Sequence, residues 1–170
     1  MADELQSFMD SFDSIKEEVL GERKVLEPGT YRCAVVVDGD KGTRMRESAS
    51  TGRPYIQMVY KVLEGPEEGS RVFQQLSLVG KPFALGITKR TLRCLGAGTE
   101  VVGWCRENGG MQEVIPLLAG RICDVVVVVR QDQNRRQENG EPYPPRNEVT
   151  SVEEVEQDPI ETASMAFGGY

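Results

Sequence analysis

Basic side chains gather in two polar stretches that lie far apart in the sequence. Both stretches are punctuated by glycine or proline, as surface loops are. Lysine and arginine neutralise the phosphates of a nucleic acid, and several of them on one loop can follow its backbone. The pattern predicts phosphate binding shared by two loops, with a solvated hairpin as the alternative for each loop alone. The residues are Lys41, Arg44, Arg46 and Arg53 in the stretch 38–53, and Arg130, Arg135, Arg136 and Arg146, with Tyr143, in the stretch 130–146.

Two aromatic rings are predicted to stand on otherwise polar strand faces. Apolar residues alternate with polar ones in two neighbouring segments, so that Tyr55 and Phe73 fall opposite the apolar faces. Lys61 and Arg71 share the polar faces with these rings. Exposed rings beside cations form a surface on which nucleic-acid bases stack. The alternative is that a second layer, such as an N-terminal helix, covers both rings.

The chain lacks the residues on which most catalytic sites depend. It contains no histidine, no Cys-x-x-Cys pair and no glycine-rich phosphate loop. We therefore expect no enzymatic activity, no cofactor and no metal site. A magnesium-dependent enzyme that uses Asp38 and Asp40 ranks last, because aspartates are common in turns for conformational reasons. The cysteines occur in apolar stretches, which predicts buried free thiols; they are Cys33, Cys94, Cys105 and Cys123.

Charged residues are distributed unevenly along the chain, with both ends acidic and the middle basic. Residues 1–27 carry eight acids and three bases, and residues 151–170 carry five acids and no base, so each end has a net charge of −5. Residues 28–150 carry 14 acids and 17 bases, a net of +3, within a whole-chain charge of −7. A basic body with an acidic tail is typical of a protein that binds a polyanion and covers its own site. Deleting 151–170 is then expected to tighten nucleic-acid binding at low salt, with a solubilising tail as the alternative.

The hydrophobic pattern divides the chain into short strands and two helical regions. An amphipathic helix is expected over 3–20, packed on the domain's own surface, with a dimer or partner contact as the alternative. A second helical region is expected over 81–107. No apolar run is long enough to span a bilayer and the N-terminus is acidic, which predicts a cytoplasmic protein with no membrane contact. Strands are expected over 30–37, 55–63, 70–78, 121–129 and 147–152.

This order of elements is that of the OB fold. The predicted fold class is mainly β, a five-stranded OB-fold barrel over 25–152 with a helical insertion between strands 3 and 4. An N-terminal helix occupies 1–24, and a disordered acidic tail occupies 153–170. In OB folds the second and third strands and the 1–2 and 4–5 loops form the oligonucleotide cleft. Here those two loops are the two basic stretches, a coincidence that favours nucleic-acid binding.

Short motifs in a fixed order give roughly residues 25–150 a family resemblance. They are Leu26-Glu-Pro-Gly-Thr-Tyr31, Tyr60-Lys-Val-Leu-Glu-Gly65, Gly69-Ser-Arg-Val-Phe73, Leu76-Ser-Leu78, Leu118-Ala-Gly-Arg121 with the valine run after it, and Asn147-Glu-Val149. With them the chain resembles the phage-encoded single-stranded DNA-binding proteins, a family often described only as a phage domain of unknown function. The resemblance implies an OB fold, sequence-independent binding and protection of single-stranded DNA in phage replication or recombination, and a place in the host cytoplasm.

The C-terminal tail is similar in kind to tails by which such proteins recruit replication enzymes. Its last residue is a tyrosine where phenylalanine is typical. The expected partners are single-stranded DNA and, through the tail, replication or recombination proteins; a homodimer is left open. The alternative function is a protein-binding β-barrel adaptor of phage origin with solvated loop arginines and covered rings. The predicted partner-binding residues are Glu153, Glu154, Glu156, Asp158, Glu161, Phe167 and Tyr170.

Overall fold

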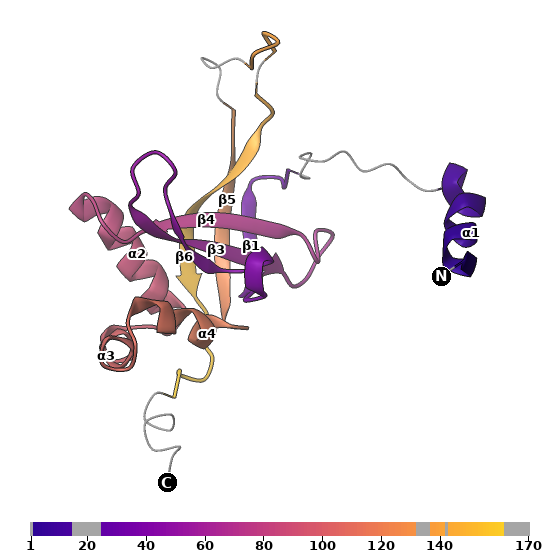
Figure 1. Ribbon diagram of the computed structural model, residues 1–170. Coiled ribbons are helices and arrows are strands. Elements are labelled where there is room, and N and C mark those ends of the chain that lie inside the picture. The colour runs from indigo at the N-terminus through magenta and orange to yellow at the C-terminus, as the bar shows by residue number, and fades with distance from the viewer. Residues whose placement is uncertain (1, 15–24, 132–136, 142, 162–170) are drawn as a thin grey trace.

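A six-stranded antiparallel sheet forms the centre of the molecule, with helices between its fourth and fifth strands (Figure 1). This computed structural model describes residues 2–14, 25–131, 137–141 and 143–161. The strands are β1 Gly29–Val35, β2 Arg44–Glu47, β3 Pro54–Val62, β4 Arg71–Ser77, β5 Ile122–Arg130 and β6 Arg146–Glu154. The α-helices are α1 Ala2–Ser11, α2 Pro82–Cys94, α3 Thr99–Glu107 and α4 Val114–Leu118, and the 3-10 turns are η1 Phe12–Ser14, η2 Gly39–Lys41 and η3 Met111–Glu113.

One edge of β3 is lined by a strand that is interrupted once. β1 pairs with β3 with Val35 opposite Tyr60, and β2 continues along the same edge with Arg44 opposite Gln57. The prediction of a loop over all of 38–53 is therefore wrong, because four of its residues form β2. The chain is polar and basic there, and β2 is ordered by its pairing with β3 rather than by its own hydrophobic pattern.

The interruption between β1 and β2 is closed by three hydrogen bonds. The Val36 amide donates to the Val59 carbonyl at 2.9 Å, and the Thr43 amide donates to the Val36 carbonyl at 2.7 Å. The Val59 amide in turn donates to the Thr43 hydroxyl at 2.9 Å. A β-carbon on Gly42 would lie only 2.2 Å from the Asp38 amide nitrogen, so the chain turns back here through a space that only glycine fits.

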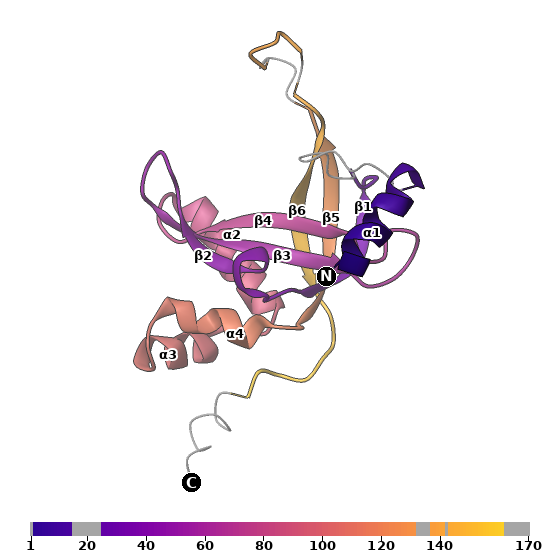
Figure 2. The same cartoon turned by 45° about the vertical axis from the view of Figure 1, so that its right-hand side comes forward.

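Across the sheet, β5 lies between β6 and β1, β1 and β2 share one edge of β3, and β4 pairs with the other edge of β3 (Figure 2). With β1 and β2 taken as one interrupted strand, this order is consistent with an OB-like fold. The predicted five-stranded closed barrel is corrected in two respects. There are six strands, and within the described ranges no ladder joins β4 to β6, although the two come close to each other.

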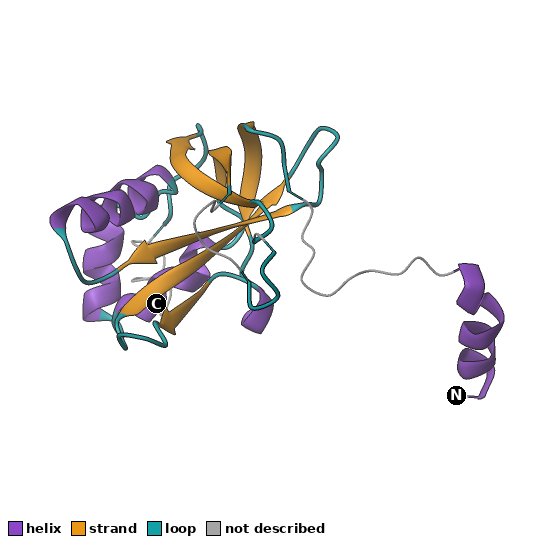
Figure 3. Ribbon diagram, turned by 90° about the horizontal axis from the view of Figure 1, so that it is seen from above, coloured by secondary structure: helices purple, strands orange, loops and turns teal. Residues whose placement is uncertain are grey.

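The core lies between the inner face of the sheet and the helices that follow β4, which gather on one side of the molecule (Figure 3). α2 and α3 confirm the helical region predicted over 81–107. The Thr88 hydroxyl fixes α2 to the sheet by donating to the Ser77 carbonyl at 2.6 Å. The buried Tyr60 hydroxyl donates to the Gln74 side chain at 2.6 Å, which satisfies its hydrogen bond inside the core. Among the described helices, none is long and apolar enough to cross a bilayer.

The chain enters the sheet through a clasp between Leu26 and Asn147. The Leu26 amide donates to the Asn147 side-chain oxygen at 2.8 Å. The Asn147 side-chain amide donates back to the Leu26 carbonyl at 2.9 Å. With Leu26 itself buried in the core, this pair fixes the start of the folded body beside the first residues of β6.

The described part of the N-terminal helix is not packed on the domain. It covers Ala2–Ser11 and runs into η1; residues 15–20 of the predicted helix lie outside the described ranges. Its large apolar side chains are exposed, Met9 by 68% and Phe12 by 62%. The prediction that this face packs on the chain's own surface is therefore wrong. The periodicity of apolar residues shows that one face of a helix is apolar, but it does not show what covers that face.

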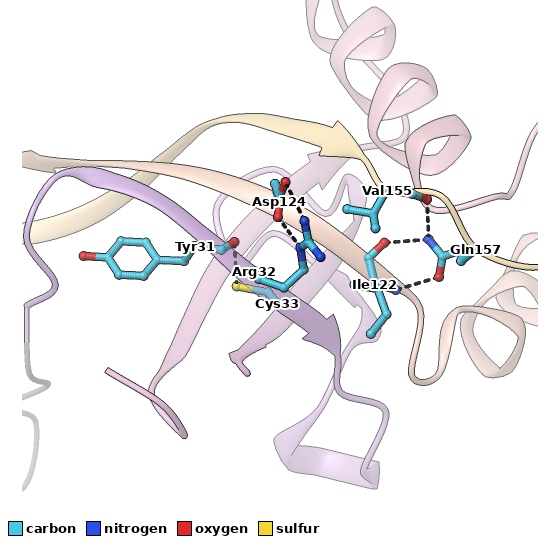
Figure 4. Close-up of polar contacts among 7 residues, drawn as sticks. All are labelled: Tyr31, Arg32, Cys33, Ile122, Asp124, Val155 and Gln157. Atoms are coloured by element: carbon cyan, nitrogen blue, oxygen red, sulfur yellow. Dashed lines mark hydrogen bonds and ion pairs between the residues drawn. The ribbon is translucent and has the colours of Figure 1, made fainter. Parts of the chain in front are cut away.

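The first part of the predicted tail is bound to the body. β6 continues to Glu154, two residues beyond the start predicted for the tail. Past the strand, the Gln157 side chain accepts from the Ile122 amide at 2.9 Å and donates to the Ile122 carbonyl at 2.7 Å (Figure 4). Arg121 donates to the Asp158 carbonyl at 2.6 Å, and Ile160 packs against the core. Glu153 and Glu154 thus belong to β6, the segment that follows is attached to the body by these contacts, and residues 162–170 lie outside the described ranges.

The buried thiols of Cys33 and Cys123 face each other across β1 and β5 and should resist modification. Burial, with the nearby Asp124 carboxylate, raises the pKa of Cys33 to about 12, and burial likewise raises the pKa of Cys123. At pH 8 neither thiol carries an appreciable thiolate fraction, so labelling by a maleimide is expected only after unfolding. Peptide mapping by mass spectrometry checks this, and rapid labelling of either residue in the folded protein would contradict it.

The raised pKa of Cys33 makes the free energy of unfolding depend on pH. An unfolded cysteine ionises near pH 8.5 while folded Cys33 stays protonated to about pH 12, so the unfolded state binds fewer protons between these values. The free energy of unfolding is therefore expected to fall as pH rises from 8 to 10.5. Urea titrations measure this fall, which Cys33→Ala should make shallower.

Candidate nucleic-acid interface

The outward side chains of β2, β3 and β4 form one continuous surface, which we call the platform. The register places Arg46 and Ser77 on either side of Tyr55, and Arg44 and Gln75 on either side of Gln57. Residues directly opposite each other in an antiparallel pair share one face of the sheet. The platform therefore joins three strands; its members are Arg44, Arg46, Tyr55, Gln57, Val59, Lys61, Arg71, Phe73, Gln75 and Ser77.

One end of the platform is open, polar and basic. Arg46 is exposed, and its guanidinium donates to the Gln57 side-chain oxygen at 2.7 Å. Arg44 and Tyr55 are half-buried. A half-buried ring bordered by two guanidinium groups offers a π-face to a base and positive charge to the phosphates on either side of it. The sequence prediction that Tyr55 shares a face with basic groups is met by this geometry.

The middle of the platform is covered. Val59 points outward but is only 1% exposed, and its neighbour Thr43 is buried beside it. The segment that carries η2 lies over this part of the sheet, where the Arg71 guanidinium donates to the Lys41 carbonyl at 3.1 Å. Phe73, opposite Val59, is half-buried. The two predicted rings are therefore not equivalent, and Tyr55 is the better placed for stacking.

Arg53 extends the basic end of the platform toward α2. It closes the turn between β2 and β3, where the Ser48 amide donates to the Arg53 carbonyl at 2.9 Å. A β-carbon on Gly80 would lie 3.8 Å from the Arg53 guanidinium, so this side chain reaches the connection between β4 and α2. Arg44, Arg46 and Arg53 thus surround the Tyr55 end of the platform.

The second predicted basic stretch is the far end of the β5–β6 hairpin. Arg130 and Arg146 lie opposite each other at that end, and both are exposed. Arg130 forms an ion pair with Glu148 at 2.7 Å. An exposed pair of this kind is worth about 0–1 kcal/mol, so a phosphate can replace the carboxylate at little cost. Tyr143 is exposed, and the predicted contacts Arg135 and Arg136 lie outside the described residues.

The two basic stretches rise on the same side of β3 and β4. In Figures 1 and 2 the turn 48–53 and the far end of the β5–β6 hairpin both project above these strands, as separate extensions. A cleft that joins the two stretches stays a prediction. Lys61 lies at the other end of the platform, beside Arg71.

The acidic side chains of the predicted tail lie at the opposite end of β6 from these arginines. Glu154 pairs with Cys123 in the register, whereas Arg146 pairs with Arg130. Glu154 lies eight residue steps along the strand from Arg146, about 26 Å at 3.3 Å per step. Charges so far apart are screened at physiological salt, where the Debye length is about 8 Å. The placement does not favour covering of the hairpin by Glu153, Glu154, Glu156, Asp158 or Glu161; Phe167 and Tyr170 lie outside the described residues.

Sequence reasoning missed a third basic surface, on α2. Phe83 is 81% exposed at the start of this helix, and Lys81 precedes it. The signal was present in the sequence, because no acidic residue occurs between Gly69 and Thr99. Within the described ranges no cluster of three or more metal-binding side chains is found.

Comparisons with known proteins add little to this geometry. No protein-family model matches the chain, and no curated protein matches it. Among solved structures, the chain is similar to one titled "Yeast RPA bound to ssDNA", at 8% sequence identity and a TM-score of 0.34. The similarity covers 92% of this chain and 91% of that one. A similarity at this level bears on neither fold nor function.

Proposed function

We propose that this protein binds single-stranded DNA without sequence preference and without catalysing a reaction. The observation that carries the proposal is the register that sets Tyr55 between Arg46 and Ser77, on a face shared with Arg44. A ring with cations on one sheet face is the arrangement that sequence-tolerant strand binding uses, since every base has a π-face and every nucleotide a phosphate. The resemblance to phage single-stranded DNA-binding proteins supports the same assignment, with a role in replication or recombination.

The binding mode follows from the geometry. One base stacks on Tyr55, and the adjacent phosphates meet Arg44, Arg46 and Arg53. The DNA strand then passes toward the β5–β6 hairpin. There Arg146 binds a phosphate, and Arg130 binds another when the phosphate replaces the Glu148 carboxylate. Gln57 and Gln75 offer amide groups that can donate to or accept from any base edge, which is compatible with binding that ignores sequence.

Salt dependence tests the proposal. If Arg44, Arg46, Arg53 and Arg146 each neutralise one phosphate, log K should fall against log salt with a slope of about −3 for a single strand. Affinity for a thymidine 20-mer, measured by fluorescence anisotropy, is then expected to drop about 50-fold between 50 and 200 mM salt. The matching duplex is the control.

Each of two outcomes would overturn the proposal. One is equal affinity for the duplex and the single strand. The other is absence of binding to the 20-mer at 50 mM salt, which would favour the protein-binding adaptor instead. Arg53→Gln should reduce the slope by about 0.7, whereas Lys89→Gln, an exposed position of α2 that is not part of the platform, should leave it unchanged.

The C-terminal segment has a separate role in the proposal, the recruitment of replication or recombination proteins. Residues 162–170 carry no charge and contain Phe167 and Tyr170. Since the bound segment 153–161 keeps its contacts with β5 and the core, a chain that ends at Glu161 should keep its affinity for DNA. A fall in DNA affinity of this shortened chain would contradict the separation of the two roles.

A further inference from the structure

The exposed side of α2 carries apolar side chains that no described part of the chain covers. We call Val79, Phe83, Leu85 and Ile87 the α2 patch; all four are exposed, and Phe83 is the most exposed of them at 81%. The opposite side of the helix is buried, with Thr88 bonded to β4 and Leu92 in the core. Phe83 and Ile87 lie one helical turn apart and form the centre of the patch, whereas Val79 precedes the helix and Leu85 lies at its flank. An exposed aromatic and aliphatic pair of this kind is typical of a protein contact rather than of a solvated helix face.

The α2 patch is surrounded by positive charge. Lys81, Lys89, Arg90 and Arg93 are all exposed around it. No acidic residue of the same segment offsets them, because the chain has none between Gly69 and Thr99. A ligand for this surface therefore has to be apolar in its centre and negative at its edges.

The N-terminal helix has this complementary character. Leu5, Phe8, Met9 and Phe12 recur at helical spacing and are exposed, and the Phe8 and Phe12 rings pack edge to face with centroids 5.8 Å apart. Residues 2–14 contain four acids and no base. On a helical projection Glu4 and Asp13 fall on either side of the apolar stripe.

We propose that α1 of one molecule docks on the α2 patch of a second copy of this chain. In Figures 1 and 3, α1 and α2 lie at opposite ends of the molecule with the sheet between them, so a second copy presents the accessible patch. The docked helix buries the Phe8–Phe12 pair against Phe83 and Ile87. Glu4 and Asp13 then meet the surrounding lysines and arginines.

This contact is heterologous, since it joins two different surfaces. A pair joined by one such contact keeps one free α1 and one free α2 patch, on different molecules, so assembly either closes into a ring or continues as a row. Molecules arranged in a row along one strand would bind that strand cooperatively. Phe83 is the one member of the patch that offers a ring to a base; Val79, Leu85 and Ile87 are aliphatic and offer no stacking surface, so an apolar helix fits the whole patch better than a nucleic acid does.

Sedimentation of the full-length chain without DNA tests the proposal. The wild type is expected to gain mass with concentration above the 18.9 kDa of one chain. Phe8→Ser/Phe12→Ser and Phe83→Ser/Ile87→Ser should each stay monomeric. Their equimolar mixture should form a dimer and nothing larger, since it retains one intact α1 and one intact patch per pair.

A charge reversal keeps the test independent of whether serine weakens either helix. Glu4→Lys/Asp13→Lys and Lys89→Glu/Arg90→Glu should each associate at least tenfold more weakly than the wild type, and their mixture should recover a dimer. A wild type that stays monomeric up to 100 µM would overturn the proposal. So would either mixture remaining monomeric, which indicates docking within one chain.

A DNA-binding measurement distinguishes the docking proposal from the proposed role of the platform in binding DNA. At concentrations where all chains are monomeric, Phe83→Ser/Ile87→Ser should bind a thymidine 20-mer within twofold of the wild type. A loss of tenfold or more there would assign the patch to nucleic acid and overturn the docking proposal. Association can fail while the platform still binds DNA, and the reverse also holds, so the two results remain distinguishable.

Discussion

Replacing Tyr55 by alanine is expected to weaken binding to a thymidine 20-mer by about 5- to 150-fold, the effect of losing about 1–3 kcal/mol of base stacking. The ring lies where Arg44 and Arg46 converge on the platform, so its loss removes the surface between two phosphate contacts. Since Tyr55 is half-buried on the outer face and not part of the core, the fold should survive the change. Fluorescence anisotropy at constant salt measures the loss.

Tyr55→Phe is the matched control. It keeps the ring and removes only the hydroxyl, so stacking should remain within about threefold of the wild type. Phe73→Ala should cost less than Tyr55→Ala, because Phe73 lies beside the covered part of the platform at Val59. Equal losses for the two alanine variants would mean that the segment over Val59 moves away when DNA binds. An unchanged affinity of Tyr55→Ala would remove the platform from the binding site.

Gly42→Ala is expected to destabilise the protein by about 3 kcal/mol or more, at or beyond the upper end of what overpacking usually costs. The new methyl group would lie 2.2 Å from the Asp38 amide nitrogen and 2.9 Å from the Val36 carbonyl oxygen. Both are backbone atoms, which cannot swing aside as a side chain can. The clash can be relieved by displacing the segment between β1 and β2. This displacement also breaks the hydrogen bond between Thr43 and Val59. Urea denaturation followed by circular dichroism measures the loss.

The second effect of Gly42→Ala separates this mechanism from ordinary destabilisation. Displacing the segment shifts β2, and with it Arg44 and Arg46, relative to Tyr55, so DNA affinity should fall even at temperatures where the variant is folded. Gly86→Ala is the matched control: no atom lies within 4 Å of its added methyl group. In the interior of α2 this change should raise stability by about 0.5–1 kcal/mol. Similar stabilities for the two variants would contradict the clash at Gly42.

The strands with alternating or continuous apolar patterns were predictable from the sequence. β3 and β4 carry apolar residues on one face and mostly polar residues on the other. In the valine run of β5, Val125 and Val127 are buried but Val129 is 38% exposed, and the run is shielded on one face and not on both. These patterns also set which residues share the platform, so Tyr55 and its polar neighbours were placed on the correct face. Their register with β2 was not predictable, because β2 has no apolar alternation and is ordered only by pairing.

Two further differences arise from contacts between distant parts of the chain. The segment after β6 is acidic and reads as a flexible tail, yet Gln157 and Asp158 bond to Ile122 and Arg121 at the start of β5. The N-terminal helix was predicted from its apolar stripe, but that stripe is exposed. In both cases the composition of the segment was interpreted correctly and its partner was not, since a partner is a property of the folded arrangement and not of local sequence.

The clasp between Leu26 and Asn147 has a mechanical consequence. Asn147 follows Arg146 directly, so Leu26 is anchored beside the arginines at the far end of the hairpin, which would bind DNA. Tension applied to the N-terminal segment by a neighbouring molecule is therefore delivered to that hairpin before it reaches the rest of the sheet. Moving one bound molecule along the DNA would thus pull on the hairpin of the next molecule. The spacing between neighbours would then affect the DNA affinity of each one.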